Sequence, residues 1–220
     1  MKKRNTIIFY LVFFLFSGLH AQEKPSFGFQ VGPTLSTQTR VVFYDVNPIV
    51  RVSSSINILY PVNKKLNFRI HLAYEKKGLK GETFYSLDSS ATNIIDDFVP
   101  TTKYNYLTLP LLLERSFGKN VKFSIGAGTY VAYVVRIKDI IDYGNADRET
   151  LIRKDFSFIN RVDIGLSGSA NMMYPISDKL GININLLYNR GLVPIVKKEI
   201  SPVSIYHSAA SLLFGLNYTL

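Results

Sequence analysis

Few side chains in this chain have types and spacings that could do chemistry. His71 and His207 are two of its three histidines. A hydrolytic Ser/His pair needs both groups on one face, but His207 and Ser208 are adjacent, so a strand turns them to opposite faces. His71 falls on the polar face with Arg69 and Glu75, too few ligands for a metal. We therefore predict no catalytic residues, and a buried hydrogen bond as the role of His71.

Two further motifs lack the context that their chemistry needs. Gly126-Ala127-Gly128 could suggest a phosphate-binding loop, but it lies within an alternating strand and no helix begins after it. This context favours a role of the glycines in packing inside a barrel. A calcium loop would need EF-hand spacing, which the acidic residues Asp139, Asp142, Asp147 and Glu149 do not have. The chain has no cysteine, so thiolate metal sites and disulfides are excluded. We predict no cofactor and no metal.

The charges that remain of interest fall on the polar faces of predicted strands. They are three guanidinium groups and three carboxylates: Arg51, Arg69, Glu75, Glu114, Arg161 and Asp163. In a narrow interior such groups can neutralise one another, and the loss of one partner leaves a buried charge unpaired. We predict that they form a charge cluster that fills the lumen of a barrel.

The strands that would hold this cluster are indicated by a hairpin-like sequence pattern that occurs twice. Residues 59–74 and 173–188 share a Tyr-Pro step, a polar turn ending in Lys-Leu and a closing Tyr. After each turn the apolar residues recur at every second position, the period of a strand with one apolar and one polar face. The pattern predicts an antiparallel meander.

Along the whole chain the alternation predicts eight strands. They lie near residues 26–36, 49–60, 66–75, 103–115, 121–136, 158–174, 180–189 and 206–220. Tight turns near 61–65, 118–120 and 175–179 alternate with long loops at 37–48, 76–102, 137–155 and 191–204. Short turns at one end, long loops at the other and an even number of strands are typical of an outer-membrane barrel. Pro110 removes a ladder donor from a strand without an edge, so we expect a bulge there.

Alternation alone leaves open which face points outward, because a soluble barrel of the lipocalin kind would bury its apolar face. The polar face is rich in small uncharged residues such as Ser167, Ser169, Asn183 and Asn185, which suit a narrow lumen better than a solvated surface. Tyrosines gather near strand ends, as in interfacial girdles. We therefore expect the apolar face to contact lipid, and name as lipid-facing Leu109, Leu111, Ile184, Leu186, Phe214 and Leu216.

The first residues predict export. Lys2-Lys3-Arg4 precedes an apolar run from Ile7 to Phe16, and small residues follow, with a cleavage site expected after Ala21. An uncleaved anchor is the alternative, but ten apolar residues span only about 15 Å as a helix, roughly half a hydrocarbon core. We predict a signal peptide over 1–21 and a barrel domain over 22–220.

The formal net charge of +10 includes the three cations of the leader. Much of the remaining basic charge falls between predicted strands, at residues 76–80, 153–154 and 197–198. Such residues are usually solvated loop charges; the alternative is a site for lipopolysaccharide phosphates or another anion. Nucleic acid is not an expected partner of an exported chain with scattered basic loops.

The segment Tyr106-Leu107-Thr108-Leu109-Pro110-Leu111-Leu112-Leu113-Glu114, the run Gly126 to Tyr133 and the Tyr-Pro hairpin at Tyr174 resemble the PorT-type outer-membrane β-barrel family. The likeness runs from about Phe27 to Leu220. It implies an eight-stranded barrel, and it makes a role in type IX protein secretion an analogy, because no segment singles out PorT itself.

Together these observations predict an all-β, eight-stranded antiparallel up-and-down transmembrane barrel in the outer membrane of a Gram-negative bacterium. We expect no enzyme activity, a filled lumen and long extracellular loops that meet partners. The partners expected of such a chain are outer-membrane lipid and lipopolysaccharide, the barrel-assembly machinery and envelope or secretion proteins. The alternatives are an accessory of type IX secretion and an enzyme that modifies envelope lipid.

Overall fold

The structure is a computed structural model, and it describes residues 24–39, 46–87, 94–143, 149–153, 157–201 and 203–220. The predicted signal peptide, residues 1–21, lies outside the described residues and stays a prediction. Within the described ranges no helix is long and apolar enough to span a membrane.

The described chain is built of antiparallel strands, and eight of them close into a barrel. Around the ring these are β1 (Ser26–Thr39), β2 (Val46–Pro61), β3 (Leu66–Gly81), β5 (Ile94–Phe117), β6 (Lys122–Tyr143), β8 (Val162–Pro175), β9 (Leu180–Gly191) and β10 (Tyr206–Thr219). The first and last strands pair from Ser26↔Thr219 to Thr39↔Tyr206, so the barrel has no open edge. The predicted fold class is confirmed.

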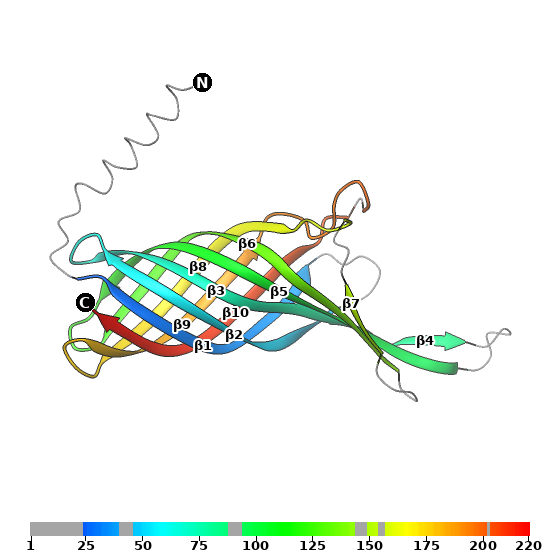
Figure 1. Ribbon diagram of the computed structural model, residues 1–220, viewed down its shortest axis with the longest axis horizontal. Coiled ribbons are helices and arrows are strands. Elements are labelled where there is room, and N and C mark those ends of the chain that lie inside the picture. The colour runs from blue at the N-terminus through cyan, green and yellow to red at the C-terminus, as the bar shows by residue number, and fades with distance from the viewer. Residues whose placement is uncertain (1–23, 40–45, 88–93, 144–148, 154–156, 202) are drawn as a thin grey trace, which may run out of the picture.

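The two ends of the barrel differ (Figure 1). Tight turns join β2 to β3, β5 to β6 and β8 to β9 at the end where the C-terminus lies. One of them needs glycine, because Gly118 has a φ of 96° and a Cβ there would lie 2.1 Å from the carbonyl oxygen of Val121. In outer-membrane barrels short turns face the periplasm, so we call this the periplasmic end and the opposite one the extracellular end.

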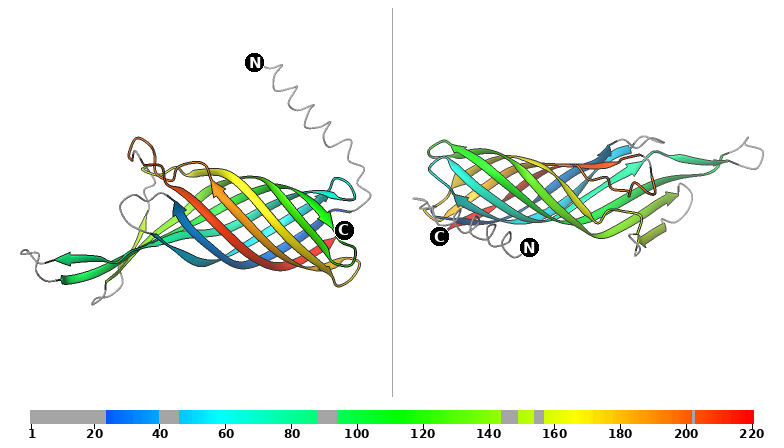
Figure 2. Two further views of the ribbon diagram at one scale, coloured as in Figure 1. Left: turned by 180° about the vertical axis from the view of Figure 1, so that it is seen from behind. Right: turned by 90° about the horizontal axis from the view of Figure 1, so that it is seen from above.

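Two strands are much longer than predicted and leave the barrel at its extracellular end (Figure 2). β5 has 24 residues and β6 has 22, and the short strands β4 (Phe84–Leu87) and β7 (Glu149–Arg153) pair with their outer edges. We call this four-stranded projection, β4-β5-β6-β7, the leaf. The prediction of loops throughout 76–102 and 137–155 is therefore wrong, because strand pairing continues well beyond the barrel wall.

The predicted bulge at Pro110 is also wrong. On the β5–β6 side Pro110 pairs in register with Tyr130, and the register shift lies instead between Asn105 and Tyr106. On the β3 side the paired positions stop at Ile70↔Leu111 and resume in the same register at Ala73↔Thr108. The barrel thus accommodates the missing proline donor by a short interruption of one ladder rather than by an extra residue.

At its extracellular end the barrel wall overlaps itself. The β2–β3 register shifts between Pro48 and Ser54, and there the Ser36 hydroxyl of β1 contacts the backbone of Gly78 in β3 directly, accepting from its N–H at 2.8 Å. A Cβ at Gly78 would lie 2.4 Å from Ile49 of β2. This part of β2 therefore covers the outer face of β3, and glycine allows the close approach.

An apolar cap closes the extracellular mouth. Ile159 and Ile195 come from the segments that precede β8 and β10, and they pack with barrel residues that include Tyr104 and Ile137. Backbone hydrogen bonds tie these segments together, from Asn160 N–H to Ile195 O at 2.8 Å and from Ile195 N–H to Ile205 O at 2.7 Å. The connection between β9 and β10, predicted only as a long loop, is folded over the mouth.

Candidate functional site

The lumen holds two charged clusters at different depths, and both are built on β3. Its inner face presents Arg69, His71, Glu75 and Lys77, each of which is almost completely buried. The period of two that exposes Leu72 and Tyr74 outward turns these polar residues inward. One strand thus supplies the lumen with charge at both levels.

The deeper cluster lies toward the periplasmic end. Arg69 Nε lies 2.9 Å from Glu114 Oε1, and the Arg69 guanidinium also donates to Asn57 Oδ1 at 3.0 Å. Glu114 further accepts hydrogen bonds from the hydroxyls of Ser124, at 3.1 Å, and Ser169, at 3.0 Å. Gly126 leaves room for this carboxylate, since a Cβ there would lie 2.6 Å from Glu114 Cγ. The charge is neutralised and its oxygens are hydrogen-bonded, which a buried ion pair requires.

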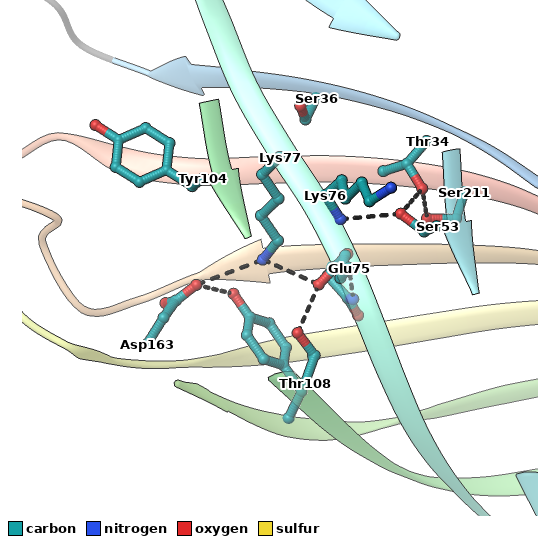
Figure 3. Close-up of polar contacts among 12 residues, drawn as sticks. Thr34, Ser36, Ser53, Glu75, Lys76, Lys77, Tyr104, Thr108, Asp163 and Ser211 are labelled. Carbon is teal, nitrogen blue, oxygen red and sulfur yellow. Dashed lines mark hydrogen bonds and ion pairs between the residues drawn. The ribbon is translucent and has the colours of Figure 1, made fainter. Parts of the chain in front are cut away.

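The second cluster surrounds Lys77, nearer the extracellular end (Figure 3). Its ammonium lies 3.3 Å from Glu75 Oε2 and 3.6 Å from Asp163 Oδ2. The rings of Tyr106 and Tyr130 also lie against it, with centroids 5.0 Å and 4.9 Å from Nζ. We call Lys77, Glu75, Asp163, Tyr106 and Tyr130 the lysine cage. It combines ion pairing with cation–π contact around one fully buried amine.

Neutral donors complete the lysine cage. Thr108 Oγ1 donates to Glu75 Oε2 at 2.9 Å, and the Tyr130 hydroxyl donates to Asp163 Oδ2 at 2.7 Å. Asn189 Nδ2 donates to Glu75 Oε1 at 3.0 Å. These bonds join β3, β5, β6, β8 and β9 across the lumen, so the cage cross-links most of the barrel wall.

Amide and hydroxyl groups fill further parts of the lumen beside the two clusters. The Thr34 hydroxyl lies 2.7 Å from that of Ser53 and 2.8 Å from that of Ser211, which ties three strands together. Gln30 hydrogen-bonds Asn183, and Asn183 Nδ2 donates to Asn171 Oδ1 at 2.8 Å. These small polar side chains are buried, as a narrow barrel interior requires.

The two histidines are buried in the lumen. His207 lies edge-on to the rings of Tyr104 and Tyr106, at centroid distances of 4.8 Å and 5.4 Å. Among the described residues neither ring nitrogen of His71 has a hydrogen-bond partner, contrary to the predicted bond. In the same part of the chain no group of His, Cys, Asp and Glu side chains could hold a metal. The side chains of Asp147 and Glu149 lie outside the described residues.

Four of the six predicted lumen charges, Arg69, Glu75, Glu114 and Asp163, are buried in the lumen. Arg161 is exposed, and its guanidinium donates to the hydroxyl of Tyr133 at 3.4 Å on the outer face. The prediction failed there because β8 begins only at Val162, so the alternation of the strand does not extend to Arg161.

Lys77, which was not among the predicted lumen charges, is a buried cation of the lumen, whereas Arg161 is not. Lys77 was predicted to lie in a loop, but β3 continues to Gly81 and buries its side chain completely. The spacing Glu75-x-Lys77 was the available signal, because it carries the polar face of the strand one step further.

Arg51 begins on the inner face of β2, opposite Thr34, but its guanidinium does not enter the charged clusters. It lies in the overlap of β2 and β3, where it donates to the carbonyl oxygens of Lys77 and Tyr104, both at 3.0 Å. It also donates to Asn105 Oδ1 at 2.9 Å. The predicted lumen charge is therefore a clamp on the barrel wall.

The residues named as lipid-facing lie on the outer face. Leu186, Phe214 and Leu216 are exposed there, and Leu109, Leu111 and Ile184 are partly exposed. Exposed apolar side chains surround the barrel, whereas the inner face buries polar ones. The protein is thus apolar outside and polar inside, the inverse of a soluble barrel.

Below the deeper cluster the lumen opens at the periplasmic end into a cavity of about 540 Å³. We call it the vestibule. Arg69 and Asn67 line its inner part, and the exposed side chains of Lys24, Lys64 and Lys179 stand at its rim. The lumen is therefore hollow at its periplasmic end, whereas buried side chains occupy it at the lysine cage.

Several solved structures have a similar fold at low identity. OprG from Pseudomonas aeruginosa is 11% identical over 91% of this chain and 98% of its own, with a TM-score of 0.47. Neisserial surface protein A (NspA) is 14% identical over 88% of this chain and 97% of its own, with a TM-score of 0.45. Such likenesses are too weak to indicate function.

No curated protein matches the sequence significantly. Residues 20–197 match the family described as "Outer membrane protein beta-barrel domain", which covers more than half of the chain. This match agrees with the closed ring of strands, the apolar outer face and the polar lumen. The chain belongs to the outer membrane protein beta-barrel domain family.

Proposed function

We propose that this protein is a closed, non-enzymatic barrel of the Gram-negative outer membrane, which holds the leaf outside the membrane as a platform for interactions. The observation that carries this proposal is the lysine cage. A fully buried amine between two carboxylates and two aromatic rings fills the lumen there with side chains, which supports a barrel closed to water at that level. A barrel closed there can serve as an anchor, and its function then lies in what projects from it.

The leaf supports the second half of the proposal. It is ordered by strand pairing on both sides of β5 and β6. The ring of Phe98 stacks on that of Phe84 and packs at a tilt against that of Tyr143, which links three of its strands. The ring centroids lie 5.3 Å and 6.2 Å apart. A pre-formed surface loses less conformational entropy on binding than a flexible loop does.

Placement in the membrane can be tested at neighbouring residues of β9. Arg in place of Ile184 should cost roughly 2–4 kcal/mol of folding free energy if that side chain faces the middle of the membrane. Asn185→Ser, on the lumen side, should have little effect. Folding into liposomes, followed by heat-modifiable gel mobility, compares the two variants, and equal tolerance at both positions would contradict the lipid-facing assignment.

The role of the leaf can be tested with a photo-cross-linking amino acid at Tyr85, an exposed residue of β4. Irradiation of intact cells should give adducts at Tyr85, because its side chain would meet extracellular or neighbouring envelope molecules. Tyr174, exposed at the periplasmic end, is the matched control. Adducts at Tyr174 with none at Tyr85 would argue against an extracellular platform.

A lipid-modifying enzyme is the alternative from another class. His207 is buried in the lumen, and Ser208 lies on the outer face within 2.8 Å of the Tyr188 hydroxyl, so this pair does not meet. We expect the purified barrel to release neither fatty acid nor phosphate from lipid A in detergent. Turnover that survives Ser208→Ala would require a different site, and any turnover would overturn the non-enzymatic proposal.

The second candidate function is an accessory role in type IX protein secretion, supported by the likeness of the β5 segment and the Tyr-Pro hairpins to PorT-type barrels. Deletion of the gene should then block export of secreted proteins to the cell surface. Unchanged export would contradict the secretion role and leave the first proposal as the remaining one.

A further inference from the structure

The outer face of β3, β5 and β6 carries rows of paired residues where the barrel wall reaches its extracellular end. One row is Tyr74↔Leu107↔Tyr133. The row above it is Lys76↔Asn105↔Arg136. The third is Gly78↔Lys103↔Lys138, and Lys80↔Thr101↔Ile140 follows. Residues directly opposite in antiparallel strands share a face, so these rows form one surface.

We call the five cations of these rows, Lys76, Lys80, Lys103, Arg136 and Lys138, the basic collar. Among the described residues the rows of the collar contain no carboxylate; Asp142 comes one row further out, opposite Val99. Lys80 and Lys103 border a groove of about 260 Å³, which Arg51 of β2 and the carboxylate residue Asp142 also line. Lys103 and Lys138 lie directly opposite each other, so this row places two cations side by side on the outer face.

The other side of the barrel has no such collar. On the outer face of β9, β10 and β1 the corresponding rows are Tyr188↔Ala210↔Leu35 and Arg190↔Ser208↔Thr37. These rows contain a single cation. The basic collar is therefore a local feature of one side, and the net charge of the chain alone does not account for it.

The basic collar begins where the apolar outer band ends. Tyr74 and Tyr133 are exposed on the outer face, and Lys76 lies over the ring of Tyr74, 5.6 Å from its centroid. Tyrosines at this position typically lie at the level of lipid headgroups, and clustered Lys and Arg at that level bind anionic headgroups.

We propose that the basic collar binds the phosphate groups of lipid A in the outer leaflet. Two features favour a lipid over a soluble anion. The collar continues downward into the tyrosines and apolar side chains that would contact acyl chains, and its cations are spread over three strands rather than gathered in a closed pocket. The proposal rests on the outer-membrane placement proposed above and adds a specific lipid to it.

The test measures the lipid A that the barrel retains. Wild-type protein is purified from nanodiscs of phosphatidylcholine with a small share of lipid A, and retained lipid is measured by mass spectrometry. The variant Lys103→Gln/Arg136→Gln/Lys138→Gln removes three collar cations. The matched control, Lys24→Gln/Lys64→Gln/Lys179→Gln, removes three exposed cations at the periplasmic end.

The collar variant should retain about tenfold less lipid A than wild type, and the control should stay within about twofold. Dephosphorylated lipid A should be retained poorly by all three proteins. Equal retention by the collar variant and wild type would overturn the proposal, and so would equal losses in both variants, which indicate net charge alone. Stronger binding of soluble heparin than of lipid A would overturn it in favour of a soluble polyanion site.

The same samples separate this proposal from the proposed function. Heat-modifiable mobility reports folding, and planar-bilayer recording reports whether the lumen is closed. A folded, non-conducting wild-type barrel that retains no lipid A contradicts only the lipid site. A wild-type barrel that conducts contradicts the closed-anchor function, whatever its lipid binding.

Discussion

The two halves of the lumen both contain buried ion pairs, but they differ in how these pairs are separated from water. In the extracellular half the lysine cage lies under the apolar cap, and the side chains of Lys77 and Glu75 are almost completely excluded from solvent. In the periplasmic half the side chains of Arg69 and Glu114 are buried to the same degree, but Arg69 borders the vestibule, an open cavity of about 540 Å³. Both halves use ion pairs between strands, but only one of them also excludes water with an apolar layer.

This difference indicates where the barrel is sealed. A buried charge that loses its partner must remain in a low-dielectric environment, whereas a charge next to a water-filled cavity can be hydrated. The same type of substitution should therefore have different consequences in the two halves. The following expectations run from the largest effect to the smallest.

Lys77→Met should have the largest effect. It leaves the Glu75 and Asp163 carboxylates buried without a cation, a change that typically costs about 3–5 kcal/mol of unfolding free energy. Urea unfolding of the reconstituted barrel measures the loss. Lys64→Met at the rim of the vestibule is the control, and it should change stability by less than about 0.5 kcal/mol. Equal unfolding midpoints for both variants would remove the distinction between the halves.

Glu114→Ala should cost less than Lys77→Met, about 2–3 kcal/mol. The side chain of Arg69 loses its carboxylate partner and is itself buried, but it lines the vestibule, so water from that cavity can enter the space that Glu114 vacates. Glu114→Gln, which keeps the volume and part of the hydrogen bonding, should lie between this variant and wild type. A greater loss of unfolding free energy for Glu114→Ala than for Lys77→Met would mean that the ion pair at the periplasmic end contributes more to stability, contrary to this expectation.

Ile195→Ala should weaken the apolar cap, by about 2 kcal/mol. Because the cap belongs to segments outside the barrel strands, we expect local opening rather than global unfolding. Amide hydrogen exchange should rise near Tyr104 and Ile137, while the global unfolding midpoint changes little. Ile200→Ala, at an exposed position in the same connection, should leave exchange unchanged. Unaltered exchange in Ile195→Ala would mean that the cap does not protect the mouth.

Single cysteines should perturb the barrel least and report water access directly, since the chain has no cysteine of its own. Met173→Cys lines the vestibule, and Thr108→Cys lies beside Glu75 in the lysine cage. A small charged thiol reagent should label Met173→Cys faster by about tenfold or more. Comparable labelling rates would show that water reaches the cage.

The strands of the barrel wall could be predicted from the sequence, but only some of the side chains that fill the lumen could. The period of two that sets the lipid and lumen faces is a local property, so Glu114, Asn183 and Leu186 could be assigned from their own strands. Lys77 and Arg161 were misassigned because each depends on where a strand ends. Strand ends are set by pairing with neighbours: β3 continues to Gly81 because β5 extends beside it.

The apolar cap and the leaf could not be predicted for a related reason. Ile159 and Ile195 are distant in the sequence and have no periodic context, so only the closed barrel brings them together. The pairing of β4 and β7 with the outer edges of β5 and β6 is likewise non-local. Alternation predicts which face a residue occupies, but it does not predict how far a ladder extends.

Conductance of the purified wild-type barrel in planar lipid bilayers tests the central claim most directly. With the lysine cage and the apolar cap in place, we predict no steady conductance across the membrane. A stable open channel in the wild-type protein would contradict the closed lumen and make transport the function to consider.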